Sequence, residues 1–178
     1  MRRVYAYAAY RLGEGPAAED VTSETFERAL RYRGSYDPSK GPPTAWLVGI
    51  ARRVVEDTLQ SRAAEVLASE PDLYATTEQR AFTDPADAAG MRLDLAAAVA
   101  RLSPRDRELI ALRYGSDLRS REIGKLLDMK VNAVEVALHR ALDRLRALIE
   151  DREASGRAPG KAAEAGGLAG PDAGTVPH

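Results

Sequence analysis

The chain has 178 residues, of which 44% are hydrophobic and 30% are charged, and its formal net charge is −1. It contains no cysteine and only two histidines, His139 and His178, which excludes disulfide frameworks, iron–sulfur clusters, thiol nucleophiles and histidine-based triads or metal centres. No signal-peptide core or apolar run of membrane length is present. We therefore expect a cytoplasmic protein that is not an enzyme, needs no cofactor or metal, and inserts no segment into a membrane.

Charge and composition divide the chain into four segments. Residues 63–90 carry six acidic side chains against one basic, and they separate two mildly basic blocks at 1–62 and 91–150. Aromatic residues are only 6% of the chain, and Ala, Leu and Val supply most of the apolar content, which favours helices. We expect an all-α protein: two small helical bundles, a flexible acidic linker at 63–90, and a disordered Gly/Ala/Pro-rich tail at 151–178.

The first block begins with helical patterns over residues 2–12 and about 17–32. On the second of these helices, charged residues recur at spacings of four, three and four and so share one narrow stripe. The stripe consists of Asp20, Glu24, Glu27 and Arg31. Two interpretations are open at this point: a solvated face, or a docking face for a basic partner helix.

A loop and a long helix complete the first block. Residues 33–43 are dense in turn formers, and a helix is predicted from about 44 to 62. The spacing of Trp46 within a wide apolar arc favours a core anchor over a platform for stacking bases. Arg53 lies on the opposite face of this helix, and Arg52 lies near its edge.

The second block contains a predicted helix-turn-helix. Ser103 and Pro104 form a strong helix start, and a short helix, a tight turn and a longer helix follow, as in DNA-reading units. Val136 is a branched apolar residue on an otherwise polar arc, so we expect it to face a partner. The helices are predicted at about 93–102, 104–114, 119–127 and 132–149, with the turn at 128–130.

The order of these segments resembles a family. The stretch AEDVTSETFERALRYRGSYDPSKGPPTAWLVGIARRVVED looks like the core-binding and promoter-melting domain of extracytoplasmic-function (ECF) sigma factors of bacterial RNA polymerase. The stretch LSPRDRELIALRYGSDLRSREIGKLLDMKVNAVEVALHRALDRLRALI resembles their C-terminal helix-turn-helix domain. The resemblance implies a core-binding and minus-ten domain at 1–62, short at its N-terminus, and a domain for the upstream promoter element at 91–150.

The resemblance also implies partners and site residues. The partners would be core RNA polymerase, promoter DNA and an anti-sigma factor. Polymerase binding would fall on Asp20, Glu24, Glu27, Arg28 and Arg31. Contacts to the minus-ten element would fall on Ser35, Tyr36, Asp37, Lys40, Arg52 and Arg53, with an unstacked base captured by the loop. Contacts to the upstream element would fall on Asn132, Glu135, Val136, His139, Arg140 and Arg144.

The predicted recognition helix departs from the family pattern. Where relatives typically carry Thr-Val-Lys-Ser-Arg-Leu, this chain has Ala-Val-Glu-Val-Ala-Leu over residues 133–138, so Glu135 places a carboxylate near a polyanion. The alternative function is a free-standing helix-turn-helix regulator that binds operators as a dimer. That function requires a dimer interface or an effector domain, and neither is visible in the sequence.

Overall fold

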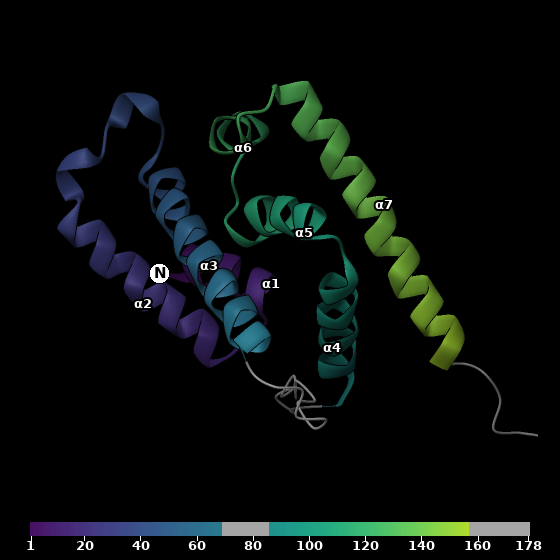
Figure 1. Cartoon of the computed structure of the whole chain (residues 1–178). Helices are drawn as coiled ribbons and strands as arrows, with labels where there is room; N and C mark the ends of the chain where they lie inside the picture. The colour runs from purple at the N-terminus through teal and green to yellow at the C-terminus, as the bar shows by residue number, and fades with distance from the viewer. Residues whose placement is uncertain (69–85, 157–178) are drawn as a thin grey trace, which may run out of the picture.

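The computed structural model describes residues 1–68 and 86–156, and the regular elements in these two ranges are helical (Figure 1). The first half, residues 1–68, contains α1 (Arg2–Leu12), α2 (Pro16–Arg31), the 3₁₀ turns η1 (Arg33–Ser35) and η2 (Pro38–Lys40), and α3 (Pro43–Ala68). The second half, residues 86–156, contains α4 (Ala86–Arg101), α5 (Pro104–Ile110), the π-helical turn η3 (Ala111–Gly115), α6 (Ser120–Leu127) and α7 (Val131–Gly156). The all-α prediction is confirmed.

Three helices are longer than the sequence predicted. No helix breaker follows residue 62 until Pro71, so α3 continues to Ala68, and α4 begins in an alanine-rich stretch at Ala86. Only residues 69–85 of the expected linker therefore remain, and they lie outside the described residues. Similarly, α7 continues to Gly156, past the expected start of the tail, and residues 157–178 lie outside the described ranges.

Local signals set the helix ends of the second half. The Ser103 hydroxyl accepts a hydrogen bond from the Asp106 backbone N–H at 3.1 Å, so the predicted N-cap of α5 is present. α6 ends at Leu127, and the residue that caps it, Asp128, has a left-handed φ of 52°. A Cβ on Gly124 would lie 2.6 Å from the Met129 carbonyl oxygen, so this tight turn requires glycine. The predicted helix-turn-helix is confirmed as α6 followed by α7.

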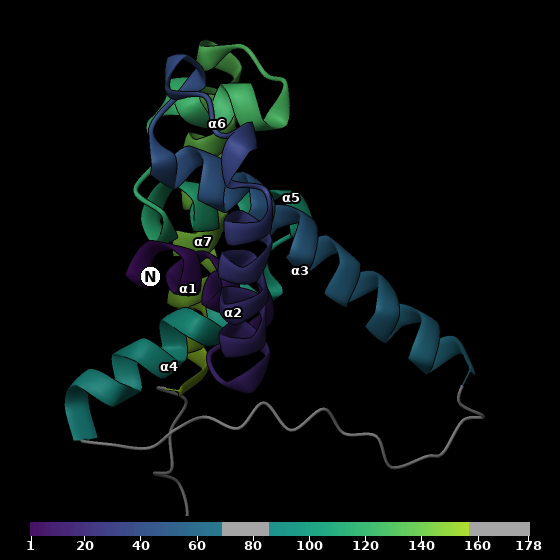
Figure 2. The same ribbon diagram turned by 90° about the vertical axis from the view of Figure 1, so that its left-hand side faces the viewer.

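The two halves pack directly against each other. α1 lies between the α2–α3 pair and the α4–α5 region (Figures 1 and 2). Its side chains Val4, Tyr7 and Ala8 are buried in a core that also holds Val48 of α3 and Leu112 of η3. This continuity was not expected for two bundles joined by a flexible linker. It arises because α1 is apolar on more than one side.

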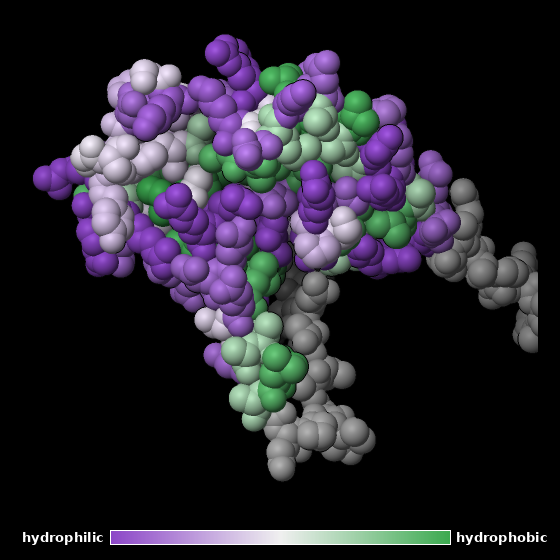
Figure 3. Space-filling view, turned by 45° about the horizontal axis from the view of Figure 1, so that its top comes forward, coloured by the Kyte–Doolittle hydropathy of each residue, from purple (hydrophilic) through white to green (hydrophobic). Residues whose placement is uncertain are grey.

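Two further hydrophobic features frame this core. A second buried cluster joins α4, α5 and α7, with Val99, Ile110 and Leu145 among its members. At the far end of α3, Val66 and Leu67 are 75% and 87% exposed. Figure 3 shows hydrophobic (green) side chains gathered at the lower end of the drawn face, while the rest of that face mixes hydrophilic and hydrophobic side chains.

Candidate functional site

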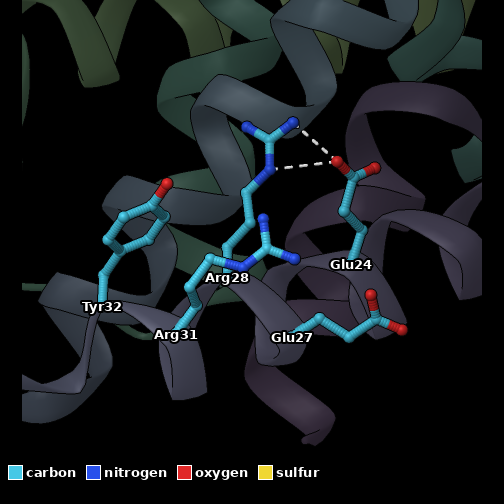
Figure 4. A pocket seen from close by; sticks show the side chains of 5 residues that line it. All are labelled: Glu24, Glu27, Arg28, Arg31 and Tyr32. Carbon is cyan, nitrogen blue, oxygen red and sulfur yellow. Dashed lines mark hydrogen bonds and ion pairs between the residues drawn. The ribbon is translucent and has the colours of Figure 1, made fainter.

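The charged stripe on α2 is solvent-exposed, with its residues pointing away from the core. Glu24 accepts two hydrogen bonds from the Arg28 guanidinium, at 2.6 and 3.0 Å, and Arg28 also reaches Asp57 of α3 at 3.0 Å (Figure 4). The hydrogen bond to Glu24 is the main cause of a raised pKa for Arg28. Asp20 and Glu27 are exposed and form no ion pair with any residue in the described ranges. They are therefore available to a cationic partner.

The loop between α2 and α3 is ordered by its own side chains. The Asp37 carboxylate accepts hydrogen bonds from the backbone N–H and hydroxyl of Ser39 at 2.9 and 2.7 Å, and these bonds lower the pKa of Asp37. The Tyr36 hydroxyl donates to the Gly41 carbonyl at 3.3 Å. The Tyr36 ring lies 5.5 Å from that of Trp46, at an interplanar angle of 52°. The loop thus presents a fixed aromatic pair.

An open cavity of about 710 Å³ lies beside this aromatic pair, between the first half and α6. We call it the loop cavity; Tyr32, Trp46, Arg52, Arg53 and Leu126 are among the residues that line it. Trp46 is half-buried on its wall, so the expectation of a core anchor was wrong for this side chain. Aromatic faces next to guanidinium groups suit an unstacked nucleotide.

The two neighbouring arginines on α3 differ in their availability. The Arg52 Nε donates to Glu108 of α5 at 2.7 Å, and the same guanidinium lies 3.1 Å from Glu56. Burial alone would lower the pKa of Arg52, but the bond to Glu108 and the charges of Glu108 and Glu56 outweigh burial and raise it. Arg53 is exposed and has no ion pair within the part of the chain that the structure describes.

The outer arc of α7 faces solvent near its N-terminus. Val136 is 51% exposed, and the His139 imidazole lies 3.5 Å from the Asp143 carboxylate. The remaining exposed members of the arc are Asn132, Glu135 and Arg140. One apolar side chain, one amide, one carboxylate and two basic groups are thus presented together on the second helix of the helix-turn-helix.

Comparison with known proteins identifies the family. Sigma-70 region 2 matches residues 1–65, and sigma-70 region 4 matches residues 92–145. The ECF RNA polymerase sigma factor BldN of Streptomyces coelicolor is 34% identical over 83% of this chain, which spans 56% of the length of BldN. SigM of Bacillus subtilis, also an ECF sigma factor, is 31% identical, with 83% of this chain and 89% of SigM covered.

The chain belongs to the ECF RNA polymerase sigma factors. Sigma factors of this family direct promoter recognition by RNA polymerase and are not enzymes. The solved structure of the sigma factor RpoE from Bartonella quintana, in complex with the anti-sigma factor NepR, shares the fold. Its TM-score is 0.69 at 23% identity, with 83% of this chain and 89% of that chain covered. Within the described residues, every helix is too short or too polar to cross a membrane.

One predicted DNA contact of this sigma factor has a structural partner. The Arg144 Nη1 donates to both carboxylate oxygens of Asp106 on α5, at 2.9 and 2.8 Å. Asp106 is 6% exposed and also accepts from the Ser103 hydroxyl at 2.8 Å. Arg144 therefore holds α7 against α5, in contrast to the five residues of the exposed arc.

Sequence reasoning missed a charged cluster between the two halves of the sigma factor. The Glu108 carboxylate accepts a hydrogen bond from Arg52 of α3. The same carboxylate lies 3.5 Å from the Arg11 guanidinium and 3.4 Å from the Tyr7 hydroxyl, and both of these residues belong to α1. Burial and the Glu108 charge raise the pKa of Tyr7. These partners are far from Glu108 in the sequence, so no local pattern could have paired them.

Proposed function

We propose that this ECF sigma factor binds core RNA polymerase through the charged stripe on α2, reads the melted minus-ten element at the loop cavity, and contacts the upstream element through α7. The observation that supports polymerase docking is that Asp20 and Glu27 are exposed carboxylates with no ion-pair partner among the described residues. Arg28 and Glu24 form an ion pair, so in this proposal they hold each other's side chains in place beside the carboxylates of Asp20 and Glu27. Arg31 extends the stripe toward the loop between α2 and α3.

Co-elution with core RNA polymerase tests this proposal against the free-standing regulator. A sigma factor forms a stoichiometric complex with the polymerase and needs it to open a promoter. A regulator would instead bind duplex DNA as a dimer in the absence of polymerase, and it would not co-elute. We also propose that residues 1–62 form the core-binding and minus-ten domain and that residues 91–150 form the domain for the upstream element. Residues 63–90 join the two domains.

The minus-ten site would combine an aromatic pair with basic side chains. Tyr36 and Trp46 offer ring faces for a splayed base, and Arg53, which is exposed and has no ion pair among residues 1–68 and 86–156, can meet a phosphate. Asp37 would act by holding the loop in shape through Ser39. The other members of the proposed site are Ser35, Lys40 and Arg52.

Substitution of the loop aromatic tests minus-ten readout. Tyr36→Ala should lower the stability of the open complex by about 1–3 kcal/mol, since a stacking face for one base is removed. Arg53→Ala should reduce the salt dependence of promoter opening by about one phosphate contact. Permanganate footprinting of the melted strand measures both effects. Arg62→Ala, an exposed position on the same helix, is the control, and footprints as strong as wild type for Y36A and R53A would disprove the site.

The upstream site would read bases through a helix that carries an added negative charge. Asn132 suits adenine, Glu135 accepts from the cytosine amino group, and Val136 suits a thymine methyl. His139 and Arg140 would supply basic contacts. Arg144 would contribute by positioning α7, because Asp106 already binds its guanidinium.

Glu135→Lys should tighten binding to duplex DNA of any sequence, because a repelling carboxylate is replaced by a phosphate ligand. It should also relax preference at one base position if Glu135 reads cytosine. Selection from a random duplex pool, with both proteins side by side, measures the two effects. Glu150→Lys makes the same charge change toward the other end of α7 and should alter neither. A wild-type pool without enrichment would rule out upstream readout by this helix alone.

An anti-sigma factor is the regulatory partner that we propose for this chain. The similar structure of Bartonella RpoE was solved with the anti-sigma factor NepR, and membership of the ECF group supports the same kind of control here. We further propose that the protein works in the cytoplasm, where RNA polymerase is found. Pull-down of the tagged chain from its own cells, followed by mass spectrometry, would test for an anti-sigma factor and for core RNA polymerase.

A further inference from the structure

His139 lies at the centre of the outer arc of α7. Its imidazole is 75% exposed, and its Nε2 lies 3.5 Å from the Asp143 carboxylate. Glu135 and Asp143 lie one helical turn before and one turn after His139, so two carboxylates flank the imidazole on one face of the helix. The helices that pack on α7, which are α4, α5 and α6, lie against its buried apolar side. The imidazole therefore faces solvent between two carboxylates.

The basic side chains on this part of α7 differ in their availability to DNA. Arg144 is bound to α5, and Arg146 lies 3.5 Å from the Asp143 carboxylate. Arg140, in contrast, is exposed and has no ion pair among residues 1–68 and 86–156. The outer arc thus holds one permanent cation that no carboxylate of the described ranges engages.

The net charge of the outer arc depends on His139. Among its five residues, Glu135 carries a negative charge and Arg140 a positive charge, so the two charges cancel while the imidazole is neutral. A proton on His139 makes the arc net positive. Because DNA is a polyanion, this single proton changes the arc from electrostatically neutral to attractive.

Protonation also changes the hydrogen-bonding capacity of the imidazole. A neutral imidazole has one N–H donor and one acceptor nitrogen, whereas an imidazolium has two donors. Nε2 is directed at Asp143, and Nδ1 is the other ring nitrogen. Only the protonated ring can donate from Nε2 to Asp143 and from Nδ1 to a phosphate oxygen at the same time.

We infer that His139 is a proton-dependent phosphate contact of the upstream DNA site, and that it strengthens as pH falls through the range in which histidine side chains titrate. The inference rests on the proposed role of the outer arc in upstream binding. A duplex phosphate stabilises the imidazolium, so the complex takes up a proton from solvent. Affinity is therefore highest below this pH range and is lost as pH rises through it.

Three variants separate this contact from other effects of pH. His139→Gln keeps a polar side chain that carries no charge, and His139→Lys carries a charge that is constant between about pH 6 and about pH 8. His178→Gln removes the other histidine of the chain, which contains only these two. H178Q is therefore the matched control, and the N-terminal amine is common to all four proteins.

Binding of the full-length chain to a fluorescein-labelled duplex of mixed sequence tests the inference, with fluorescence anisotropy at fixed salt. Wild type and H178Q should bind about fivefold more tightly at about pH 6 than at about pH 8, which is the effect of one added phosphate contact near physiological salt. H139Q should show no such gain, and H139K should bind tightly at both pH values. In wild type and H178Q, the slope of log affinity against log salt should steepen by about 0.9 at the lower pH.

The outcomes distinguish this inference from the proposed function. A gain at low pH that H139Q loses and H178Q keeps supports the inference. Duplex binding that does not depend on pH would overturn it and leave the outer arc as the upstream site. A gain that H139Q retains would also overturn it, because another group would then take up the proton. Wild type that binds no duplex at either pH would contradict both the proposed upstream site and this contact.

Discussion

Asp20→Lys combined with Glu27→Lys should abolish co-elution of the chain with core RNA polymerase while the helical fold survives. Both carboxylates are exposed and have no ion pair within the described ranges, so their reversal breaks no internal contact. At an interface, loss of a paired buried charge costs about 2–5 kcal/mol, and reversal adds repulsion. We expect at least about a 30-fold weaker complex.

The matched control reverses two other acidic residues near the start of α2. Glu14→Lys with Glu19→Lys changes the net charge by the same amount, and both positions are exposed but lie off the stripe. Gel filtration with core polymerase and circular dichroism should be run on both double variants. If D20K/E27K co-elutes as wild type does, the stripe is not the docking face.

Arg144→Ala should lower the free energy of unfolding by about 2–3 kcal/mol. The substitution leaves Asp106, which is 6% exposed, as a buried carboxylate without its cation. Because Arg144 itself is half-exposed, we place the effect below that of a fully buried pair. Urea denaturation of the full-length chain without DNA measures this loss directly.

Arg146→Ala provides the comparison on the same helix. Its ion pair with Asp143 spans 3.5 Å and both side chains are exposed, so its removal should change stability by less than about 0.5 kcal/mol. Equal and small losses for R144A and R146A would show that Arg144 is not a structural residue. Arg144 would then belong with the exposed DNA-binding arc.

Elements set by local patterns could be predicted from the sequence. Ser103 with Pro104 specifies the start of α5 through one capping hydrogen bond, and the three-four spacing of Asp20, Glu24 and Glu27 places them on one exposed face. Neither result depends on residues far along the chain. The family resemblance rested on the same stretches, which sigma-70 regions 2 and 4 match.

Features that depend on distant residues could not be predicted in this way. Trp46 has core-like spacing on its own helix, but its surroundings include the loop and Leu126 of α6. Arg52 and Arg53 are adjacent in sequence, and only the approach of Glu108 from α5 distinguishes them. Similarly, the basic side chain of Arg144 predicted a DNA contact, and only the packing of α5 against α7 brings the Asp106 carboxylate to its guanidinium.

The position of Trp46 gives the protein a built-in optical signal. It is the single tryptophan of the chain, and it is half-buried on the wall of the loop cavity, which Leu126 also lines. Indole emission shifts to longer wavelength when the ring meets water. A nucleotide that enters the loop cavity would displace water from the indole, so a stopped-flow trace of unlabelled protein would report how quickly the proposed minus-ten site is occupied.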